Sequence, residues 1–340
     1  VYQKKTTDLL ISRTLPGSAG FASTYYNQGS MKNNGVELSL NAQIIDKKDW
    51  KWSVSGNIGF NKSEIAELGL LPSDFGFLGE KVGYYGNSIG DHFGVGHVFL
   101  EGEAPGLFFG YVTQGIVQPE DITEQGVRYT KKDGTVGYYK TFNKVTPVAG
   151  DIKFVDSDGD GDVNVNDRDV IGDPNPDFTY GFSTNISWKN LSLSASFAGV
   201  QGKDILNTNN RYVNTPGTRS NNLTRKAYQN MWTESNHSNL YPSSTFVIQN
   251  YVMDRYVEDA SYLRCADITL NYILPKTWMS KIGFQNASVY ASVKNAFIIT
   301  NYSGYDPDVN SFGFDGLRPG VDMSSYPTPR SFIFGLNLTF

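Results

Sequence analysis

The stretch FTYGFSTNISWKNLSLSASFAG, residues 178–199, has the alternation of a β-hairpin that crosses a membrane. Its first arm places Phe178, Tyr180, Phe182, Thr184, Ile186 and Trp188 on one parity, and Thr179, Gly181, Ser183, Asn185 and Ser187 on the other. After a turn at Lys189-Asn190, the second arm alternates Leu191, Leu193, Ala195 and Phe197 with Ser192, Ser194, Ser196 and Ala198. Successive side chains of a strand point to opposite faces, so the hairpin has one apolar face and one small, hydroxyl-lined face.

The length and the polar face of this hairpin both favour a membrane environment. Each arm has about the ten residues that a tilted strand needs to cross a bilayer core. Trp188 stands at the turn, where interfacial aromatic residues belong. The polar face carries no charge before Lys189, whereas the outer face of a soluble β-sandwich usually does. The pattern therefore predicts a membrane hairpin whose polar face lines a lumen.

Composition supports short strands and excludes several classes of protein. The chain has 340 residues, with 35 Gly, 21 Tyr and 21 Phe, and it contains no long apolar run that would predict a transmembrane helix. Its net charge is -5 and its Lys and Arg residues are scattered, which excludes nucleic acid as an expected partner. Cys265 is the single cysteine, so no internal disulfide framework is expected.

Further strands of the same kind are predicted on both sides of the opening stretch. A second hairpin spans residues 36–60 around a charged turn at residues 46–49, and weaker strand patterns cover residues 94–101 and 107–116. A long loop at residues 201–261 includes an expected helix near residues 223–232. Strands then follow at residues 266–274, 287–293 and 332–340, with one helical turn expected at residues 275–283.

Short and long connections alternate along the whole chain. Outer-membrane barrels have short periplasmic turns and long external loops, so this order predicts that all the short turns lie at the periplasmic end. The fold class is therefore all-β, a transmembrane antiparallel β-barrel of about ten strands. Because the first strand pattern begins abruptly at Val1 and the loops are large, residues 1–340 are expected to be the C-terminal part of a larger, plugged barrel.

An acidic loop at residues 156–167 has the spacing of a calcium-binding EF-hand loop. Asp156, Asp158, Asp160 and Gly161 occupy positions one, three, five and six, Asp162 offers its backbone carbonyl, Asn164 a water-mediated contact, and Asp167 occupies position twelve. The standard pattern has Glu at position twelve, so Asp167 is a departure. We expect a structural Ca²⁺ at Asp156, Asp158, Asp160, Asp162 and Asp167; the alternative is a solvated acidic turn.

Other candidate residues carry no catalytic pattern. His92, His97 and His237 lack ligand spacing, no Ser has a nucleophile-elbow context, and Cys265 has no nearby His. We therefore expect no enzymatic activity. Aromatic residues crowd the longest loop: Tyr212, Trp232, Tyr241, Tyr251, Tyr256 and Tyr262. They suit contacts with sugars, peptides or a protein partner, and the alternatives are packing of the loop against itself or an interfacial girdle. No substrate-binding residue is assigned.

Several strings along the chain resemble the C-terminal barrel of SusC/RagA-type TonB-dependent transporters. They are Asp151-Ile152-Lys153-Phe154 before the acidic loop, residues 170–181 (VIGDPNPDFTYG), Asn33 to Leu40 (NNGVELSL), Gly199-Val200-Gln201-Gly202, Tyr262-Leu263-Arg264 and Tyr326-Pro327-Thr328-Pro329-Arg330. The strings span the whole chain in the order that the family has.

That resemblance implies an outer-membrane importer of Gram-negative, Bacteroidetes-type bacteria. Such a protein has a barrel of about 22 strands with a plugged lumen. It takes up glycan oligosaccharides or peptides beneath a SusD-like surface lipoprotein lid, and TonB–ExbB–ExbD supplies energy through the plug. The plug domain, the TonB box and the upstream part of the barrel have no counterpart in these residues, so this segment alone is expected to transport nothing.

Two other readings of the chain stay open at this point. A porin-like or adhesin-like outer-membrane barrel without TonB coupling has the same strand pattern. A soluble calcium-dependent binding module would keep the acidic loop but would not need a lipid-facing surface. Neither the substrate nor the oligomeric state follows from the residues.

Overall fold

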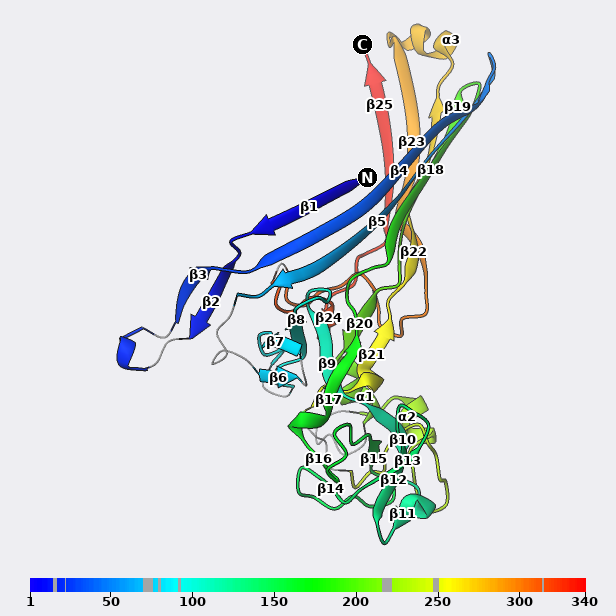
Figure 1. Ribbon diagram of the computed structural model, residues 1–340. Coiled ribbons are helices and arrows are strands. Elements are labelled where there is room, and N and C mark those ends of the chain that lie inside the picture. The colour runs from blue at the N-terminus through cyan, green and yellow to red at the C-terminus, as the bar shows by residue number, and fades with distance from the viewer. Residues whose placement is uncertain are drawn as a thin grey trace.

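The computed structural model describes residues 1–14, 17–21, 23–69, 76–78, 81–90, 93–215, 222–246, 251–313 and 315–340. It consists of one long, twisted antiparallel sheet and a folded lobe attached to one end of that sheet (Figure 1). We call these two regions the wall and the lobe. The wall is the upper part of Figure 1 and the lobe is the lower part.

The wall contains eight strands in the order β1-β4-β5-β18-β19-β22-β23-β25. Their bounds are β1 (Tyr2–Thr7), β4 (Ser30–Asp46), β5 (Trp50–Glu67), β18 (Phe178–Trp188), β19 (Leu191–Gln201), β22 (Tyr262–Ile273), β23 (Asn286–Thr300) and β25 (Ser331–Thr339). All neighbouring pairs are antiparallel. This arrangement confirms the predicted all-β, antiparallel fold class.

The opening stretch forms the predicted hairpin at the centre of the wall. β18 and β19 pair in continuous register from Phe178 opposite Gln201 to Trp188 opposite Leu191. Lys189 turns the chain with φ +51°, a left-handed conformation that a two-residue hairpin turn requires. The ladder fixes the side-chain parity, because residues directly opposite each other share a face.

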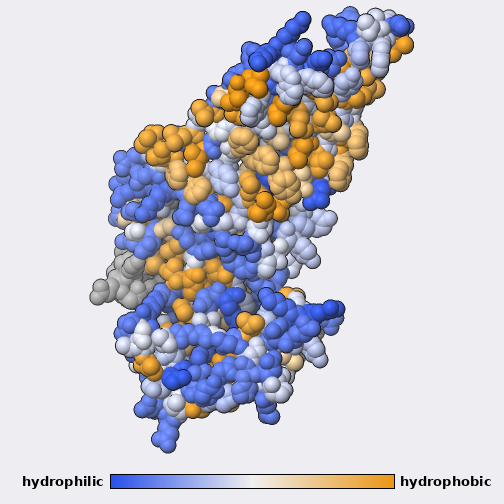
Figure 2. Space-filling view, turned by 90° about the vertical axis from the view of Figure 1, so that its right-hand side faces the viewer, coloured by the Kyte–Doolittle hydropathy of each residue, from blue (hydrophilic) through white to orange (hydrophobic). Residues whose placement is uncertain are grey.

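The two faces of the wall differ as the alternation predicts. Outward-facing apolar side chains stay exposed, from Leu40 (69%) in β4 to Phe334 (80%) in β25. They form the hydrophobic band across the upper part of Figure 2. An apolar band between two polar ends is typical of strands that face lipid. Among the described residues, no helix has the length and apolar character needed to cross a membrane.

The short connections all lie at the end of the wall opposite the lobe (Figure 1). Three residues join β4 to β5, and two join β18 to β19. The connection from β22 to β23 contains the predicted helical turn, α3 (Lys276–Met279) and a 3₁₀ turn at Ser280–Ile282, and Gly283 ends it with φ +85°. The predicted short turns at residues 46–49, 189–190 and 275–283 thus lie at one end of the wall, whereas the short turn predicted there at residues 102–106 joins β8 (His97–Leu100) to β9 (Leu107–Tyr111) in the lobe.

The predicted number of about ten membrane strands is wrong, since the wall has eight. The two weak patterns at residues 94–101 and 107–116 do form strands, but these belong to the lobe. There, β8 (His97–Leu100) and β9 (Leu107–Tyr111) are buried along their whole length. Strands covered on both faces need no alternation, which is why their pattern was poor.

Two wall strands are also longer than their alternating cores. β4 begins at Ser30 and β5 continues to Glu67, so both extend past the bilayer-length segment toward the lobe. The outer part of β4 pairs with β1, from Tyr2 opposite Gly35 to Thr7 opposite Ser30. A bulge interrupts the β19–β22 ladder: Ser196 is opposite Asp267 and Phe197 is opposite Cys265, so Ala266 is the extra residue, and Cys265 takes its place in the apolar face predicted for residues 266–274.

The lobe is built from short sheets that the three longest connections contribute together. A five-stranded sheet has the order β17-β9-β8-β7-β6, with β6 (Gly76–Leu78), β7 (Lys81–Tyr85) and β17 (Arg168–Gly172). Two small sheets have two strands each: β10 (Thr113–Ile116) with β15 (Ile152–Phe154), and β14 (Thr141–Phe142) with β16 (Asp162–Val163). Two others have three strands each: β11 (Ile122–Thr123), β12 (Gly126–Thr130) and β13 (Val136–Tyr139) in one, and β21 (Val257–Asp259), β20 (Asp204–Asn207) and β24 (Val321–Asp322) in the other. A separate hairpin, β2 (Leu10–Thr14) and β3 (Ser23–Asn27), extends from the β1 edge of the wall.

An aromatic core holds the lobe together. Tyr111, Phe142 and Phe154 meet at its centre, with the rings of Phe142 and Phe154 stacked at 4.0 Å. The same core includes Val252, from the connection between β19 and β22, and Val321, from the connection between β23 and β25. Two short helices, α1 (Asn209–Asn214) and α2 (Arg225–Gln229), complete the lobe, and α2 confirms the helix predicted near residues 223–232.

Candidate metal loop and lumen-facing wall

The acidic loop lies in the lobe and is anchored at both of its ends. Asp156 follows β15, which pairs with β10, and Asp167 directly precedes β17, which pairs with β9. The Tyr129 hydroxyl donates a hydrogen bond of 2.7 Å to the backbone carbonyl of Asp156. The loop is therefore held against the lobe core and does not extend freely into solvent.

Three of the five predicted carboxylates come together. Oxygen atoms of Asp156, Asp158 and Asp167 lie within 4.8 Å of one another. Asp156 and Asp167 are buried, with 3% and 0% of their surface exposed. Gly161 has φ +90°, the sharp turn that position six of a calcium loop requires.

Backbone N–H groups fix the two buried carboxylates. Asp156 accepts hydrogen bonds from the N–H groups of Gly159 (2.7 Å) and Gly161 (2.9 Å). Asp167 accepts from those of Ser157 (2.6 Å) and Asn164 (2.7 Å). A carboxylate has about four lone-pair sites, so these bonds orient the groups and still leave positions for a cation.

The carboxylates of Asp160 and Asp162 form hydrogen bonds outside the three-carboxylate cluster. Asp160 accepts from the backbone N–H of Asp162 (2.7 Å), and the carboxylate of Asp162 accepts from the Thr141 hydroxyl. The backbone carbonyl of Asp162, which the sequence pattern offers to the metal, accepts a hydrogen bond from the Asn164 side-chain amide (2.8 Å). The structure thus assembles positions one, three and twelve of the loop.

The electrostatics of the cluster show the effect of bringing carboxylates together. Burial raises the pKa of Asp167, against the lowering effect of its backbone N–H donors. The pKa of Asp158 is raised by burial and by the neighbouring Asp160 and Asp156 charges. Burial and the same group of carboxylates raise the pKa of Tyr129 to about 12. An oxygen-only donor set with this charge suits a hard cation such as Ca²⁺.

The inner face of the wall is the second candidate site. One row across the sheet places Asn41, Ser55, Ser183, Ser196 and Asp267 side by side. The Ser55 and Ser183 hydroxyls are 2.6 Å apart. These residues line a hollow of about 530 Å³ on the polar face. They confirm that the small polar parity forms one continuous surface.

A carboxylate is held within this polar surface. Asp267 accepts hydrogen bonds from the hydroxyls of Thr269 and Ser292, each at 2.8 Å. The oxygen atoms of the Thr269 and Ser292 hydroxyls are 2.9 Å apart. Hydroxyl donors on both oxygens give the carboxylate a fixed orientation toward the lumen side of the wall.

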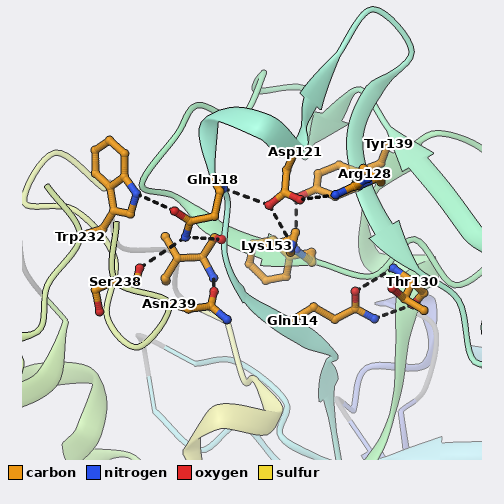
Figure 3. Close-up of polar contacts among 12 residues, drawn as sticks. Gln114, Gln118, Asp121, Arg128, Thr130, Tyr139, Lys153, Trp232, Ser238 and Asn239 are labelled. Carbon is orange, nitrogen blue, oxygen red and sulfur yellow. Dashed lines mark hydrogen bonds and ion pairs between the residues drawn. The ribbon is translucent and has the colours of Figure 1, made fainter. Parts of the chain in front are cut away.

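A polar network in the lobe was not found from the sequence (Figure 3). Asp121 is buried, pairs with Lys153 at 2.8 Å and accepts from the backbone N–H of Gln118 at 3.0 Å. The Gln118 side-chain oxygen accepts a hydrogen bond of 3.2 Å from the Trp232 indole N–H. This bond joins the connection between β5 and β18 to the connection between β19 and β22. One sequence feature could have indicated part of it: Pro119 followed by Asp121 is typical of the start of a helical turn. In the structure Pro119–Asp121 is a short 3₁₀ turn, and the Asp121 carboxylate caps it.

The aromatic residues of the longest loop pack into the lobe. Trp232, Tyr256 and Tyr262 are buried, and Tyr212 and Tyr251 pack against the core. Packing of the loop against itself is therefore the better reading for Trp232, Tyr256, Tyr212 and Tyr251, whereas Tyr262 begins β22 of the wall. Tyr241 is half-buried.

The histidines and the cysteine have structural surroundings. His97 is buried, with its Nε2 2.8 Å from the carbonyl of Pro319, and His237 stacks on Trp232 at 5.6 Å. His92 lies outside the described residues. Cys265 is buried beside the bulge of β22.

Comparisons with known proteins give the family. No family model matches the chain. It is 32% identical over 343 residues to TonB-dependent receptor P3 of Formosa agariphila, covering 100% of this chain and 32% of that protein. It is 31% identical over 350 residues to TonB-dependent receptor SusC of Bacteroides thetaiotaomicron, covering 100% of this chain and 29% of that protein.

Solved structures agree with these relatives. The RagAB peptide importer in its closed-closed state matches 99% of this chain and 33% of its own, at 27% identity and a TM-score of 0.73. The open-open state of the same importer matches 99% of this chain and 32% of its own, with a TM-score of 0.72. The chain thus spans about a third of the length of the proteins that it matches.

TonB-dependent receptors are β-barrel transport proteins of the outer membrane, not enzymes, and the wall has the two-faced strands of such a barrel. The agreement covers the whole chain, both in sequence and in fold. Over its whole length the chain is therefore similar to about a third of the length of SusC- and RagA-type TonB-dependent receptors.

Proposed function

We propose that the chain forms the C-terminal part of a TonB-dependent importer of peptides or oligosaccharides. The wall supplies a lipid-facing surface and a polar inner surface, and the lobe supplies the external end of the transport path. The single observation that carries the proposal is the match of 99% of the chain to the RagAB peptide importer. Substrate uptake belongs to the complete receptor, of which this segment is about a third.

The two edges of the wall support a larger barrel. Among the described strands, β1 has only β4 as a neighbour and β25 has only β23. An open strand edge leaves N–H and C=O groups unsatisfied, which hydrocarbon does not tolerate. We propose that both edges pair with strands encoded elsewhere in the same receptor, and that this larger barrel encloses a plug through which TonB–ExbB–ExbD acts.

A SusD-like surface lipoprotein is the proposed partner of the lobe, as the family resemblance implies. The lobe has its own aromatic core, and a folded platform binds a partner at a smaller entropic cost than unstructured loops. Affinity purification of the complete receptor from its native membrane, followed by identification of every chain, tests this partner. Recovery of the receptor without any lipoprotein would contradict it.

Uptake is tested in cells that depend on the receptor. Deleting the receptor gene should abolish uptake of labelled peptides or oligosaccharides larger than porins admit, and deleting TonB should have the same effect. The matched control is uptake of a small sugar, which should continue in both strains. Uptake that persists without TonB would favour the porin-like alternative.

We also propose that Asp156, Asp158 and Asp167, with Asp160 and Asp162 on the same loop, bind a structural Ca²⁺. Two buried carboxylates, a third beside them and the left-handed Gly161 support this proposal. The ion would neutralise the cluster and tie β15 to β17. Chelation should therefore expose the loop to trypsin, which has sites nearby at Lys144 and Arg168.

The test compares the intact receptor with two variants. Trypsin should cleave the wild type at least tenfold faster in EDTA than in Ca²⁺, and Asp156→Asn/Asp158→Asn should be cleaved fast in both conditions. Asp133→Asn, at an exposed aspartate elsewhere in the lobe, is the control and should behave as the wild type. Equal cleavage of the wild type with and without Ca²⁺ would leave the loop a solvated acidic turn.

A further inference from the structure

The end of the wall that carries the short connections is both aromatic and basic. Each of its three connections has a tryptophan within it or at the adjoining strand end: Trp50 begins β5, Trp188 ends β18 and Trp278 lies in α3. All three are about half exposed, and the rings of Trp50 and Trp188 lie 6.1 Å apart. The amino group of Lys189 lies 5.4 Å from the centre of the Trp188 ring. In Figure 2 this end is the hydrophilic tip above the hydrophobic band.

The charge of this end is opposite to that of the whole chain. The three connections and the strand ends beside them contain six lysines and two aspartates: Lys47, Lys48, Lys51, Lys189, Lys276 and Lys281, with Asp46 and Asp49. The net charge there is six minus two, or +4, whereas the whole chain has -5, so all other residues together carry -9. This separation favours a negatively charged partner at the short-turn end alone.

The α3 connection has the chemistry of a membrane interface. Met279 is buried and anchors the turn, and α3 contacts β23. Trp278 and Ile282, four residues apart, are 60% and 62% exposed. Trp278 lies in α3 and Ile282 in the 3₁₀ turn that follows it, and we call these two exposed apolar side chains the projection. Lys276 and Lys281 flank it, and no acidic residue occurs between Leu274 and Lys294.

The bilayer itself is continuous with this projection. Tyr272 near the end of β22 and Leu338 near the end of β25 are exposed on the lipid-facing side of the wall. The short turns of such barrels face the periplasm. Trp and Lys at the limit of an apolar band occupy the headgroup level, where the ring or the methylene stem is in the apolar layer and the polar atom is in water.

We propose that the α3 connection binds the anionic headgroups of phospholipids in the periplasmic leaflet. Trp278 and Ile282 insert at the boundary between headgroups and acyl chains. The amino groups of Lys276 and Lys281 hold the phosphate from the water side, and the tryptophans and lysines of the other two short turns continue the site along the wall. A protein partner at this end is the competing occupant.

The test uses the complete receptor, purified in detergent, and two lipid probes. Native mass spectrometry measures the affinity for phosphatidylglycerol, which is anionic, and for phosphatidylcholine, which is zwitterionic. The wild type should prefer phosphatidylglycerol about tenfold, because lysines near a lipid surface are attracted to anionic headgroups. Lys276→Gln/Lys281→Gln should remove most of that preference without changing the binding of phosphatidylcholine.

Two further variants separate charge from the apolar contact. Trp278→Ala should weaken the binding of both lipids by a similar factor, since the ring contacts the acyl boundary of either one. Lys131→Gln/Lys140→Gln removes the same charge from exposed positions in the lobe and should leave the preference unchanged. An unchanged preference in Lys276→Gln/Lys281→Gln, or the loss of a co-purifying protein in place of lipid, would overturn the proposal.

Discussion

Large apolar side chains are exposed on the outside of the wall, whereas in the lobe they are buried in the core. In the wall, Phe334 is 80% exposed while serines and Asp267 line the inner face. In the lobe, Tyr111 and Phe154 are buried, at 1% and 2% exposed. The wall needs lipid outside and a complete hydrogen-bond ladder, whereas the lobe is stabilised by removal of apolar surface from water. The two regions should therefore respond to different perturbations.

The largest expected effect comes from emptying the lobe core. Phe154→Ala removes a ring stacked on Phe142 and should destabilise the lobe by about 3–5 kcal/mol. Limited proteolysis should then cut the lobe while heat-modifiable migration, which reports on the barrel, stays as in the wild type. Phe334→Ala is the matched control, because that ring is mostly exposed and leaves no protein cavity. Loss of barrel migration in Phe154→Ala would show that the two regions are not separable.

Acid should weaken the lobe through His97. Burial lowers its pKa to about 4, against the raising effect of the Pro319 carbonyl. The unfolded chain takes up the proton near pH 6.5, so stability is lost as pH falls from about 6.5 to 4, by up to about 3 kcal/mol. His97→Gln cannot titrate and should show a smaller loss between pH 7 and pH 4.5 when lobe proteolysis is followed. Identical pH profiles for the two proteins would rule out this origin.

The smallest expected effect tests the parity of the wall. Leu193→Arg places a charge in lipid, which costs about 2–4 kcal/mol at the midplane and less toward the interface. Leu193 is near the short turn, so we expect about 2 kcal/mol. Ser194→Arg faces the lumen side and should cost much less. Urea unfolding of the complete receptor in lipid vesicles measures both, and equal costs would contradict the assigned faces.

The wall was predictable because strict alternation has only one structural meaning in a strand. From Phe178 to Phe197 the alternation assigns each position to one face of the sheet, and the β18–β19 register pairs positions of the same face. The sequence failed where that information ends. The bulge at Ala266 depends on two strands at once, and β8 and β9 are buried on both faces, so neither has a pattern that a single segment reveals.

The candidate metal loop was predictable in part. The spacing of Asp156, Asp158 and Asp167 reflects local loop geometry, which nearby residues determine. The partner of the Asp162 side chain, Thr141, lies 21 positions earlier, on a strand whose parallel pairing no local pattern predicts. Gln118 and Trp232 are likewise 114 positions apart, and only the folded lobe brings them together.

The interleaving of the lobe with the wall has a consequence for the order of assembly. The hairpins β4–β5, β18–β19 and β22–β23 have short connections and form from local contacts, which are fast. Residues 68–177, 110 in all, separate β5 from β18, although these strands are neighbours in the sheet. The lobe that brings their ends together takes core residues as late as Val321. We therefore expect preformed hairpins to be joined in a last, slow step, when nearly the whole chain has been delivered to the membrane.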